Sequence, residues 1–281
     1  VEHILSEIDI LIKKYNVNCI TFFDDNFVVN KKWVFELCNN LISGGYNKTA
    51  RFMCQMRGDA VTEDLLKILK TAGFDALSFG IETGSEKMAE VIRKGESVES
   101  NIKAVRLAKK YGFATLGTFI IGFPSETAED REKTLKLAMD LPLNVLRVNI
   151  AIPYPGTPLY DMVKHSITVS KGWANFNVVS PLVTGPFSKQ PLPYVPDGTT
   201  EDEIRFLMLW TNLKFWLRPK GLISFFIRKS TFVTRMPPYW YIKPRIIFEF
   251  AKVGITTFFN LVWVAFTAMK FKLIKFKTRL I

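Results

Sequence analysis

The sequence has few residues that could bind a metal or form a covalent bridge. Its three cysteines, Cys19, Cys38 and Cys54, stand far apart, and it has only two histidines. Neither CxxC nor CxxxCxxC occurs, so these 281 residues hold no complete cysteine-based metal site. Sparse, unpaired cysteines also predict a protein of the reducing cytosol.

Several other signatures are missing. The sequence contains neither GxGxxG nor GxxxxGK[ST], so a dinucleotide or P-loop phosphate site is not expected. No Ser–His–Asp set is visible: His3 lies in a helical pattern, His165 follows a strand, and both are expected at the surface. No lysine ends a predicted strand in a Schiff-base position, which disfavours an ordinary barrel lyase or aldolase. No signal peptide opens the chain, since residues 1–16 have the pattern of an amphipathic helix.

Positive charge is concentrated in the last third of the chain. The formal net charge is +12, and residues 201–281 hold 15 Lys plus Arg against 4 Asp plus Glu, which gives +11. The first 200 residues therefore carry only +1. The same last stretch holds 12 of the 24 Phe and 4 of the 6 Trp. The composition thus predicts two regions, one nearly neutral and one basic and aromatic.

The nearly neutral region repeats one helix–strand unit five times. In each unit an apolar stripe at helical spacing is followed by a short apolar run and a polar turn. The near-continuous apolar runs predict a parallel sheet covered by helices. The fold class is α/β, either doubly wound or a barrel, and both forms bind ligands at the carboxyl ends of their strands. The predicted helices cover residues 4–15, 33–42, 63–71, 98–111 and 129–141, and the strands with their turns cover 19–25, 51–59, 76–85, 114–127 and 145–157.

Polar residues or tight turns follow every predicted strand, whereas the starts of the strands show no comparable concentration of such residues. This asymmetry predicts a ligand site at one edge of the sheet, although each residue alone is equally typical of a turn. The residues are Asp24, Asp25, Arg57, Asp59, Glu82, Thr83, Ser85, Glu126, Tyr154, Pro155, Gly156 and Thr157.

The predicted rim is rich in carboxylates, with an arginine beside them. Carboxylates suit an ammonium group and ribose hydroxyls, and Arg57 suits a carboxylate, which it can bind through two parallel hydrogen bonds. S-adenosylmethionine has all of these groups.

Four segments together resemble a known family. They are FFDDNF, RGD followed by LLKILKTAGFDALSFGIETGSEKMAEVIRKG, GTFIIGFPSET, and PYPGTPLYD. Their order and spacing over roughly residues 1–165 are similar to radical S-adenosylmethionine (radical SAM) enzymes, above all the class that carries a cobalamin-binding domain.

The resemblance implies a fold and a chemistry. The fold is a partial (β/α)6 barrel of the TIM type, with a 4Fe-4S cluster held by a CxxxCxxC loop after its first strand. The cluster cleaves S-adenosylmethionine to a 5′-deoxyadenosyl radical, which takes a hydrogen from a small-molecule or lipid substrate. The resemblance also implies an electron donor such as flavodoxin or ferredoxin, and it leaves open whether cobalamin binds.

The sequence departs from the family pattern at its start. The CxxxCxxC loop is absent, only five of six strands are found, the missing strand is the first, and the first residue is Val rather than Met. We expect a longer protein whose upstream part supplies the cluster ligands, so that residues 1–165 are a barrel without its first strand. The alternative is a degenerate homologue without a cluster, which would act as a binding or membrane-associated protein.

The resemblance also assigns roles to individual residues. Asp24, Asp25 and Asn26 would occupy the turn that meets the methionine amino group, where the family more often has Gly-Gly-Glu. Glu82 would contact the methionine or ribose end, and Arg57 would lie near the carboxylate or the substrate.

Four further residues would lie along the adenosine. Gly122 would allow close approach of the backbone, and Glu126 beside it is either a ligand contact or an acid at a helix start capped by Thr127. Tyr154 and Gly156 would close the adenine end, although Tyr154 equally suits a turn aromatic packed on Pro155. No catalytic or metal-binding residue is assigned, because the three cysteines are expected to pack as small hydrophobes.

The remaining residues form two further predicted segments. Residues 166–200 are rich in Pro and Gly and are expected to be a linker or lid. Residues 201–281 are expected to be helical, basic and aromatic; Lys252 and Lys270 enclose 17 uncharged residues that include four polar ones, which is short for a membrane span. The pattern favours a helix lying on a membrane surface, with a helical cap on the barrel as the alternative and no nucleic acid expected. The predicted location is the cytoplasm, or the inner face of the membrane as a peripheral protein.

Overall fold

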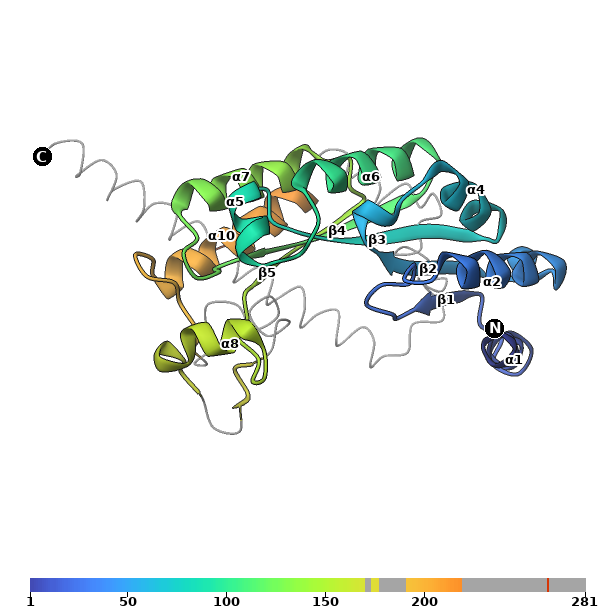
Figure 1. The fold of residues 1–281 in the computed structure, drawn as a ribbon, viewed down its shortest axis with the longest axis horizontal. Coiled ribbons are helices and arrows are strands. Elements are labelled where there is room, and N and C mark those ends of the chain that lie inside the picture. The colour runs from blue at the N-terminus through green and yellow to red at the C-terminus, as the bar shows by residue number, and fades with distance from the viewer. Residues whose placement is uncertain (170–172, 177–190, 219–261, 263–281) are drawn as a thin grey trace, which may run out of the picture. The chain divides into compact units, whose positions relative to one another are not determined.

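The computed structural model describes residues 1–169, 173–176, 191–218 and 262 of the chain (Figure 1). The chain forms two compact units. Within the described residues, the first unit comprises Val1–Phe119, Glu132–Arg147 and Arg218, and the second comprises Ile120–Arg131, residue 262 and the described part of Val148–Leu217.

Helices and strands alternate along the chain as the sequence predicts. The helices are α1 (Glu2–Lys13), α2 (Lys31–Ser43), α3 (Tyr46–Thr49), α4 (Glu63–Thr71), α5 (Glu86–Val91), α6 (Val98–Lys110), α7 (Ala128–Asp140), α8 (Pro158–Val163) and α10 (Glu201–Trp216). The strands are β1 (Cys19–Phe22), β2 (Arg51–Met56), β3 (Phe74–Glu82), β4 (Ala114–Ile121) and β5 (Val145–Ile150), and η1 (Gly58–Ala60) and η2 (Lys164–Ser166) are short 3-10 turns. All five predicted helix–strand pairs are confirmed, whereas α3, α5, α8 and the 3-10 turns were not predicted.

The five strands form one sheet in the order β1-β2-β3-β4-β5. The pairs β1–β2, β2–β3 and β3–β4 are parallel. In an open parallel sheet built in chain order, every strand ends at the same edge, and the loops that follow the strands gather there. The polar residues after β1, β2 and β3 therefore share one edge of the first unit.

Local sequence signals set the helix ends. The Thr62 hydroxyl accepts a hydrogen bond from the Leu65 backbone N–H at 3.3 Å and so caps α4. Gly73 follows α4 with φ of +95°, a left-handed conformation that only glycine adopts without cost. Both positions were predicted from the sequence.

Phenylalanine rings fill the core between the outer face of the sheet and its helices. The rings of Phe22, Phe27, Phe52 and Phe74 lie with centroids 4.9–6.0 Å apart. Helices α4 and α6 cover this face of β3 (Figure 1). Burial of such large apolar side chains supplies most of the driving force for folding.

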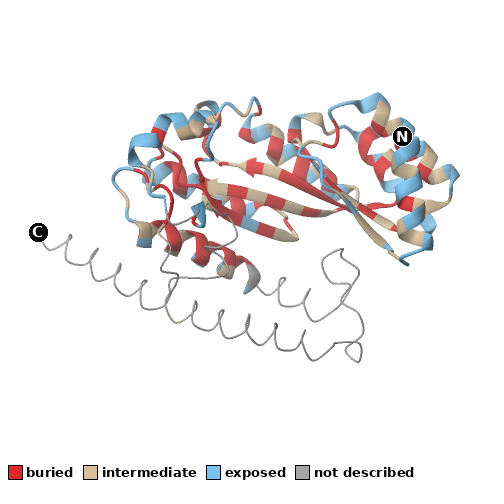
Figure 2. Ribbon diagram, turned by 90° about the horizontal axis from the view of Figure 1, so that it is seen from below, coloured by how far each residue is buried: buried red, intermediate tan, exposed pale blue. Residues whose placement is uncertain are grey.

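Helices cover one face of the sheet, as the sequence predicts, while burial along β4 alternates. Along β4, buried and half-buried residues alternate strictly, whereas most residues of β3 are buried; Figure 2 shows buried and intermediate bands along the strands of the sheet. The face opposite α4 and α6 is only partly covered by the described residues, and in the first unit it lines a cavity. A strand with one covered face and one cavity-lining face alternates with period two.

An asparagine side chain completes the hydrogen bonding of β5 in the second unit. The Asn212 amide on α10 accepts from the Val148 N–H and donates to the Val148 C=O, both at 3.1 Å, and it also donates to the Met208 C=O at 2.8 Å. Asn212 is buried. One side chain thus occupies the place that a neighbouring strand would take beside Val148.

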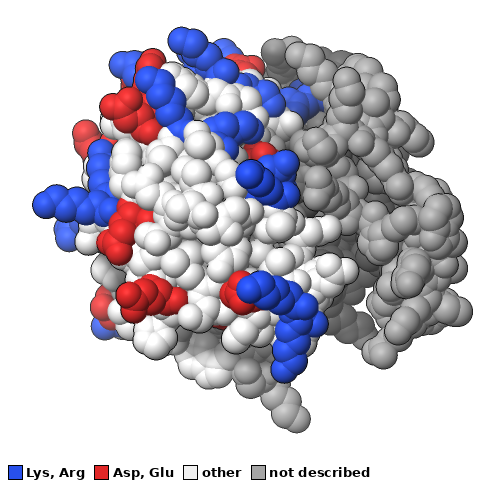
Figure 3. Space-filling model, turned by 90° about the vertical axis from the view of Figure 1, so that its right-hand side faces the viewer, with Lys and Arg blue, Asp and Glu red and all other residues white. Residues whose placement is uncertain are grey.

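Charge on the described surface is mixed in sign. Figure 3 shows basic and acidic side chains interspersed on one face of the molecule, as the near-neutral balance of the first 200 residues predicts. None of the described helices is long and apolar enough to cross a membrane. Helix α10 confirms the predicted helix at the start of region 201–281, while the predicted membrane-surface segment lies outside the described residues.

Candidate functional site

A bulge at the end of β3 displays Glu82. The β3–β4 register shifts between Gly80 and Glu82, and Glu82 itself has φ of +66°. A left-handed conformation is strained for a residue with a side chain, and bulges commonly re-aim a side chain near a functional site. The carboxylate folds back over Gly80, where an added Cβ would lie 2.5 Å from Glu82 Oε1. Gly80 therefore leaves the space in which the carboxylate sits.

The Glu82 residue is half-buried, and one oxygen of its carboxylate, Oε2, is buried without a hydrogen-bond partner in the described structure. Burial raises the pKa of Glu82, while the nearby Lys94 ammonium lowers that pKa and the Glu96 carboxylate raises it. A buried carboxylate with an unused oxygen has residual capacity to bind a donor.

Lys94 is the cation that faces this carboxylate, and its ammonium group likewise lacks a hydrogen-bond partner in the described structure. Its side chain is 15% exposed. The contact of Nζ with Glu96 Oε2 is an ion pair at 3.8 Å. Burial lowers the pKa of Lys94, against the raising influence of Glu82 and Glu96. Lys94 was not predicted as a site residue, because it follows a helix rather than a strand.

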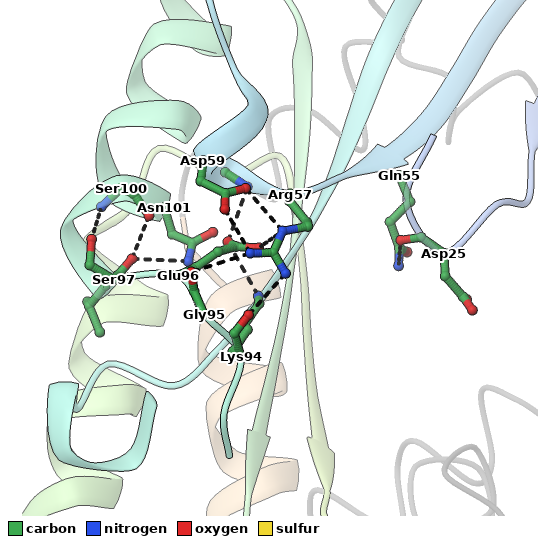
Figure 4. A network of polar contacts seen from close by, with 12 residues as sticks. Asp25, Gln55, Arg57, Asp59, Lys94, Gly95, Glu96, Ser97, Ser100 and Asn101 are labelled. Carbon is green, nitrogen blue, oxygen red and sulfur yellow. Dashed lines mark hydrogen bonds and ion pairs between the residues drawn. The ribbon is translucent and has the colours of Figure 1, made fainter. Parts of the chain in front are cut away.

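Arg57 lies in a dense polar network beside this pair (Figure 4). Its Nε and Nη2 atoms donate to the two Asp59 oxygens at 3.1 and 2.7 Å, and Nη1 donates to the Lys94 C=O at 3.0 Å. These hydrogen bonds with Asp59 raise the pKa of Arg57 and lower that of Asp59. The guanidinium is therefore already engaged on both of its edges.

Glu96 is the buried centre of the same network. Its side chain is fully buried, and Oε2 accepts from the Gly58 N–H at 3.2 Å. Arg57 Nε lies 3.0 Å from Glu96 Oε1, an ion pair without hydrogen-bond geometry, because the Nε–H points at Asp59. Glu96 thus ties the start of η1 to the loop that carries Lys94 (Figure 4).

Hydrogen bonds to its backbone hold the turn after β1 in place, and the acidic side chains of this turn are exposed. Gln55 Nε2 donates to the Asp25 C=O at 3.3 Å, and the Asn26 side chain accepts from the Val28 N–H at 3.3 Å. Asp24 and Asp25 are exposed. The structure therefore places these three predicted residues, with Arg57 and Glu82, at the strand ends of the first unit.

A tight corner follows β4 in the second unit, where the sequence reads GFPSET. Gly122 has φ of +88° and Ser125 has φ of +60°. Glu126 is buried, and its Oε2 accepts from the Gly122 N–H at 2.6 Å. The Arg131 guanidinium lies 3.7 Å from the same oxygen. The Glu126 carboxylate thus holds the corner together by binding the backbone at its start.

Glu126 is not the cap of the helix that follows it. That role belongs to Thr127, whose hydroxyl accepts from the Asp130 N–H at 3.2 Å, while Asp130 Oδ2 accepts from the Thr127 N–H at 3.1 Å. This reciprocal pair is a capping box with aspartate at its third position. The Glu126 carboxylate instead faces the backbone of Gly122, and its Oε1 accepts no hydrogen bond in the described structure.

Replacing Glu126 with glutamine should change how stability depends on pH. Burial, partly offset by the Gly122 N–H and Arg131, raises the pKa of Glu126 from 4.5 to about 7. Between these values the folded state holds the proton that the unfolded state has released, so wild-type stability falls as pH rises. Glu126→Gln keeps an acceptor for Gly122 and removes this titration. The variant should therefore gain on the order of 1–3 kcal/mol over wild type between pH 5 and pH 8.

Denaturant unfolding at a series of pH values measures this difference. Glu129→Gln, at an exposed position of α7, is the matched control and should show no such trend. A constant difference between Glu126→Gln and wild type across the range would show that Glu126 is ionised throughout.

The last two predicted residues lie after β5, also in the second unit. Tyr154 is 43% exposed, and its ring lies 6.4 Å from that of Phe176. Gly156 has φ of +83°, with open space where a Cβ would stand. Thr157 closes the turn by donating to the Tyr154 C=O at 2.7 Å. The binding roles of Gly122, Glu126, Tyr154 and Gly156 stay predictions.

The cysteines behave as packing residues rather than metal ligands. Cys38 and Cys54 are buried, and burial raises the pKa of Cys38 to about 12. Cys19 is half-buried. No group of three or more Cys, His, Asp or Glu side chains suited to a metal ion occurs in the described residues. A 4Fe-4S cluster therefore does not fit any described set of side chains.

The comparisons with known proteins agree with the fold. The model of the radical SAM superfamily matches residues 1–138. An uncharacterized methyltransferase of Pyrococcus horikoshii is 31% identical over 84% of this chain and 49% of its own length. The anaerobic magnesium-protoporphyrin IX monomethyl ester cyclase of Cereibacter sphaeroides is 27% identical over 64% of this chain and 30% of its own. The chain thus spans about half or less of these relatives.

A solved structure shows the same fold. The radical S-adenosylmethionine methyltransferase TsrM of Kitasatospora setae, solved with cobalamin and a [4Fe-4S] cluster bound, superposes with a TM-score of 0.51 at 18% identity. The match covers 58% of this chain and 31% of that one. The predicted α/β partial barrel is confirmed by this likeness.

Proposed function

Because this chain belongs to the radical SAM superfamily, we propose that the end of β3 binds the amino-acid part of S-adenosylmethionine between Glu82 and Lys94. The observation that carries the proposal is the buried pair itself. Glu82 Oε2 and Lys94 Nζ are both buried and both lack a hydrogen-bond partner within the described structure. Each such atom costs about 1–3 kcal/mol unless a ligand or water satisfies it.

The chemistry of the pair matches the two charges of the ligand. The methionine end of S-adenosylmethionine carries one ammonium and one carboxylate. Glu82 would accept from the ammonium and Lys94 would donate to the carboxylate, so that every charge gains a partner of opposite sign. The outward carboxylates of Asp24 and Asp25 are further acceptors for the ammonium.

Lys94 rather than Arg57 takes the ligand carboxylate in this proposal. The N–H groups of Arg57 already donate to the Asp59 carboxylate and to the backbone carbonyls of Lys94 and Gly95. These bonds fix the loop that carries Lys94 and make Arg57 a positioning residue. The role first predicted for Arg57 thus passes to a neighbour that it holds in place.

S-adenosylmethionine, when bound and reduced by a cluster, supplies the radical chemistry of the superfamily. The described residues contribute binding and orientation, and no cluster ligand is among them. We propose a methyl transfer on a small-molecule or lipid substrate, because methyltransferases are among the similar proteins. Cobalamin, a flavodoxin-type or ferredoxin-type electron donor, cytoplasmic location and membrane attachment stay predictions.

Neutralising either member of the pair should weaken binding of S-adenosylmethionine. Loss of one charge-assisted hydrogen bond costs about 1.5–3 kcal/mol, so Glu82→Gln and Lys94→Gln should each raise the Kd roughly tenfold to hundredfold. Glu90→Gln, at an exposed position of α5, is the matched control and should leave the Kd unchanged. Calorimetry on the reconstituted full-length protein measures all three. Equal affinities for all variants would remove the pair from the site.

A further inference from the structure

A cavity of about 190 Å³ opens on the face of the sheet opposite the phenylalanine core, within the first unit. By volume it has room for roughly six water molecules, which is the size of a functional group rather than a whole substrate. Every strand of the sheet contributes to its wall, together with the turn after β1. The cavity lining includes Thr21, Asp24, Asp25, Ser78, Thr118 and Arg147.

Arg147 is the basic residue of this wall. It stands on β5 and is exposed, and it forms no ion pair or hydrogen bond within the described structure. By contrast, Arg51 and Arg57 in the same unit are both paired with carboxylates. An arginine that faces a cavity without a counter-ion retains its full fork of donors for a ligand.

Three hydroxyl groups share the cavity with this guanidinium. Thr21, Ser78 and Thr118 come from β1, β3 and β4, and none of their hydroxyls has a hydrogen-bond partner in the described part of the chain. A hydroxyl can donate to an anionic oxygen as readily as it accepts. The wall therefore combines one fixed positive charge with several neutral donors.

We propose that this cavity binds a carboxylate of the substrate, with Arg147 as its charged partner. Arginine matches a carboxylate through two parallel hydrogen bonds, and the hydroxyls can reach the remaining lone pairs. A carboxylate is favoured over a phosphate because Asp24 and Asp25 line the same cavity, and they would repel a dianion more than a single charge.

The inference rests on the proposed function for its link to catalysis. Ser78 and Glu82 lie on one strand, four residues and so about 13 Å apart along it. A substrate whose acid group sits at Arg147 would extend from the cavity toward the strand end where S-adenosylmethionine is proposed to bind. Arg147 then selects substrates that carry an acid group and fixes their orientation.

Anion binding can be tested without knowledge of the substrate. The full-length protein is titrated with sodium acetate and, separately, with inorganic phosphate, while the Nε–Hε resonances of arginine are followed by NMR. Acetate should shift one resonance saturably, and that resonance should be missing from Arg147→Gln. Arg106→Gln, at an exposed position of α6, removes the same charge outside the cavity and should leave the response intact.

The outcomes separate the inference from the proposed function. If Arg147→Gln binds S-adenosylmethionine like wild type but no longer responds to acetate, the carboxylate site stands and the variant is folded. If acetate causes no saturable shift, or if phosphate binds at Arg147 more tightly than acetate, the carboxylate assignment is overturned. If acetate binds at Arg147 while S-adenosylmethionine does not bind the protein, the proposed function fails and the anion is not the substrate of that reaction.

Discussion

Replacing Asn212 with leucine is expected to lower the free energy of unfolding by about 2–5 kcal/mol. The Asn212 amide satisfies the N–H and C=O of Val148, and all three hydrogen bonds that it makes are buried. Leucine has nearly the same size but no polar atom, so it leaves both backbone groups unpaired inside the protein. Each buried orphan costs about 1–3 kcal/mol.

Hydrogen exchange identifies where this cost falls. In Asn212→Leu, the peptide that covers β5 should exchange faster than in wild type, because the Val148 N–H has lost its acceptor. Lys214→Leu, at an exposed position of the same helix, adds the same side chain without removing a bond and is the control. Unchanged exchange at β5 would mean that another group replaces the amide.

The second large loss of stability is expected from the substitution Gly84→Ala. An added Cβ at Gly84 would lie 2.6 Å from the Lys133 C=O oxygen and 2.9 Å from the Thr134 Cα. Both are backbone atoms of α7, which cannot move aside as a flexible side chain can. Overpacking of this kind costs about 1–3 kcal/mol, and occasionally more.

The same substitution should also disturb the neighbouring Glu82. The Gly84 N–H donates to Thr134 Oγ1 at 3.0 Å, and the hydroxyls of Thr83 and Thr134 lie 3.0 Å apart, so α7 clasps the loop that follows β3. Forcing this clasp open moves the residue that precedes it. We expect Gly84→Ala to weaken S-adenosylmethionine binding as well as stability.

Gly45→Ala is the control for this prediction. Gly45 has φ of +73° but open space around its Cβ position, so alanine there incurs backbone strain without a clash. Strain alone costs about 1–2 kcal/mol and should not affect the ligand. Denaturant unfolding and calorimetry on both variants decide the matter, and equal losses in both would rule out the predicted clash with α7.

The sequence predicted the fold well where its signals are local. Helix caps such as Thr62 and Thr127 and glycine stops such as Gly73 act within one turn of chain, and each was found where it was predicted. The order of helices and strands followed from the same short-range periodicity. The alternating burial of β4 was not predicted, because it depends on which face of the sheet the helices cover.

The candidate site was predicted in part for the same reason. Glu82 could be identified because it ends a strand. Its partner Lys94 could not, since the β3 bulge and the Glu96 network that bring them together join residues distant in sequence. Arg57 likewise gave no sign in the sequence that Asp59, two residues later, would occupy its guanidinium.

The left-handed conformation of Glu82 has a consequence for protein engineering. With φ of +66°, this position is less strained for glycine, which adopts such angles without a steric cost. A library selected only for heat resistance would therefore favour the loss of the carboxylate that the proposed function requires. Thermal selection and functional selection pull in opposite directions at this residue, so a stabilised variant of this protein has to keep Glu82 fixed while the surrounding positions are varied.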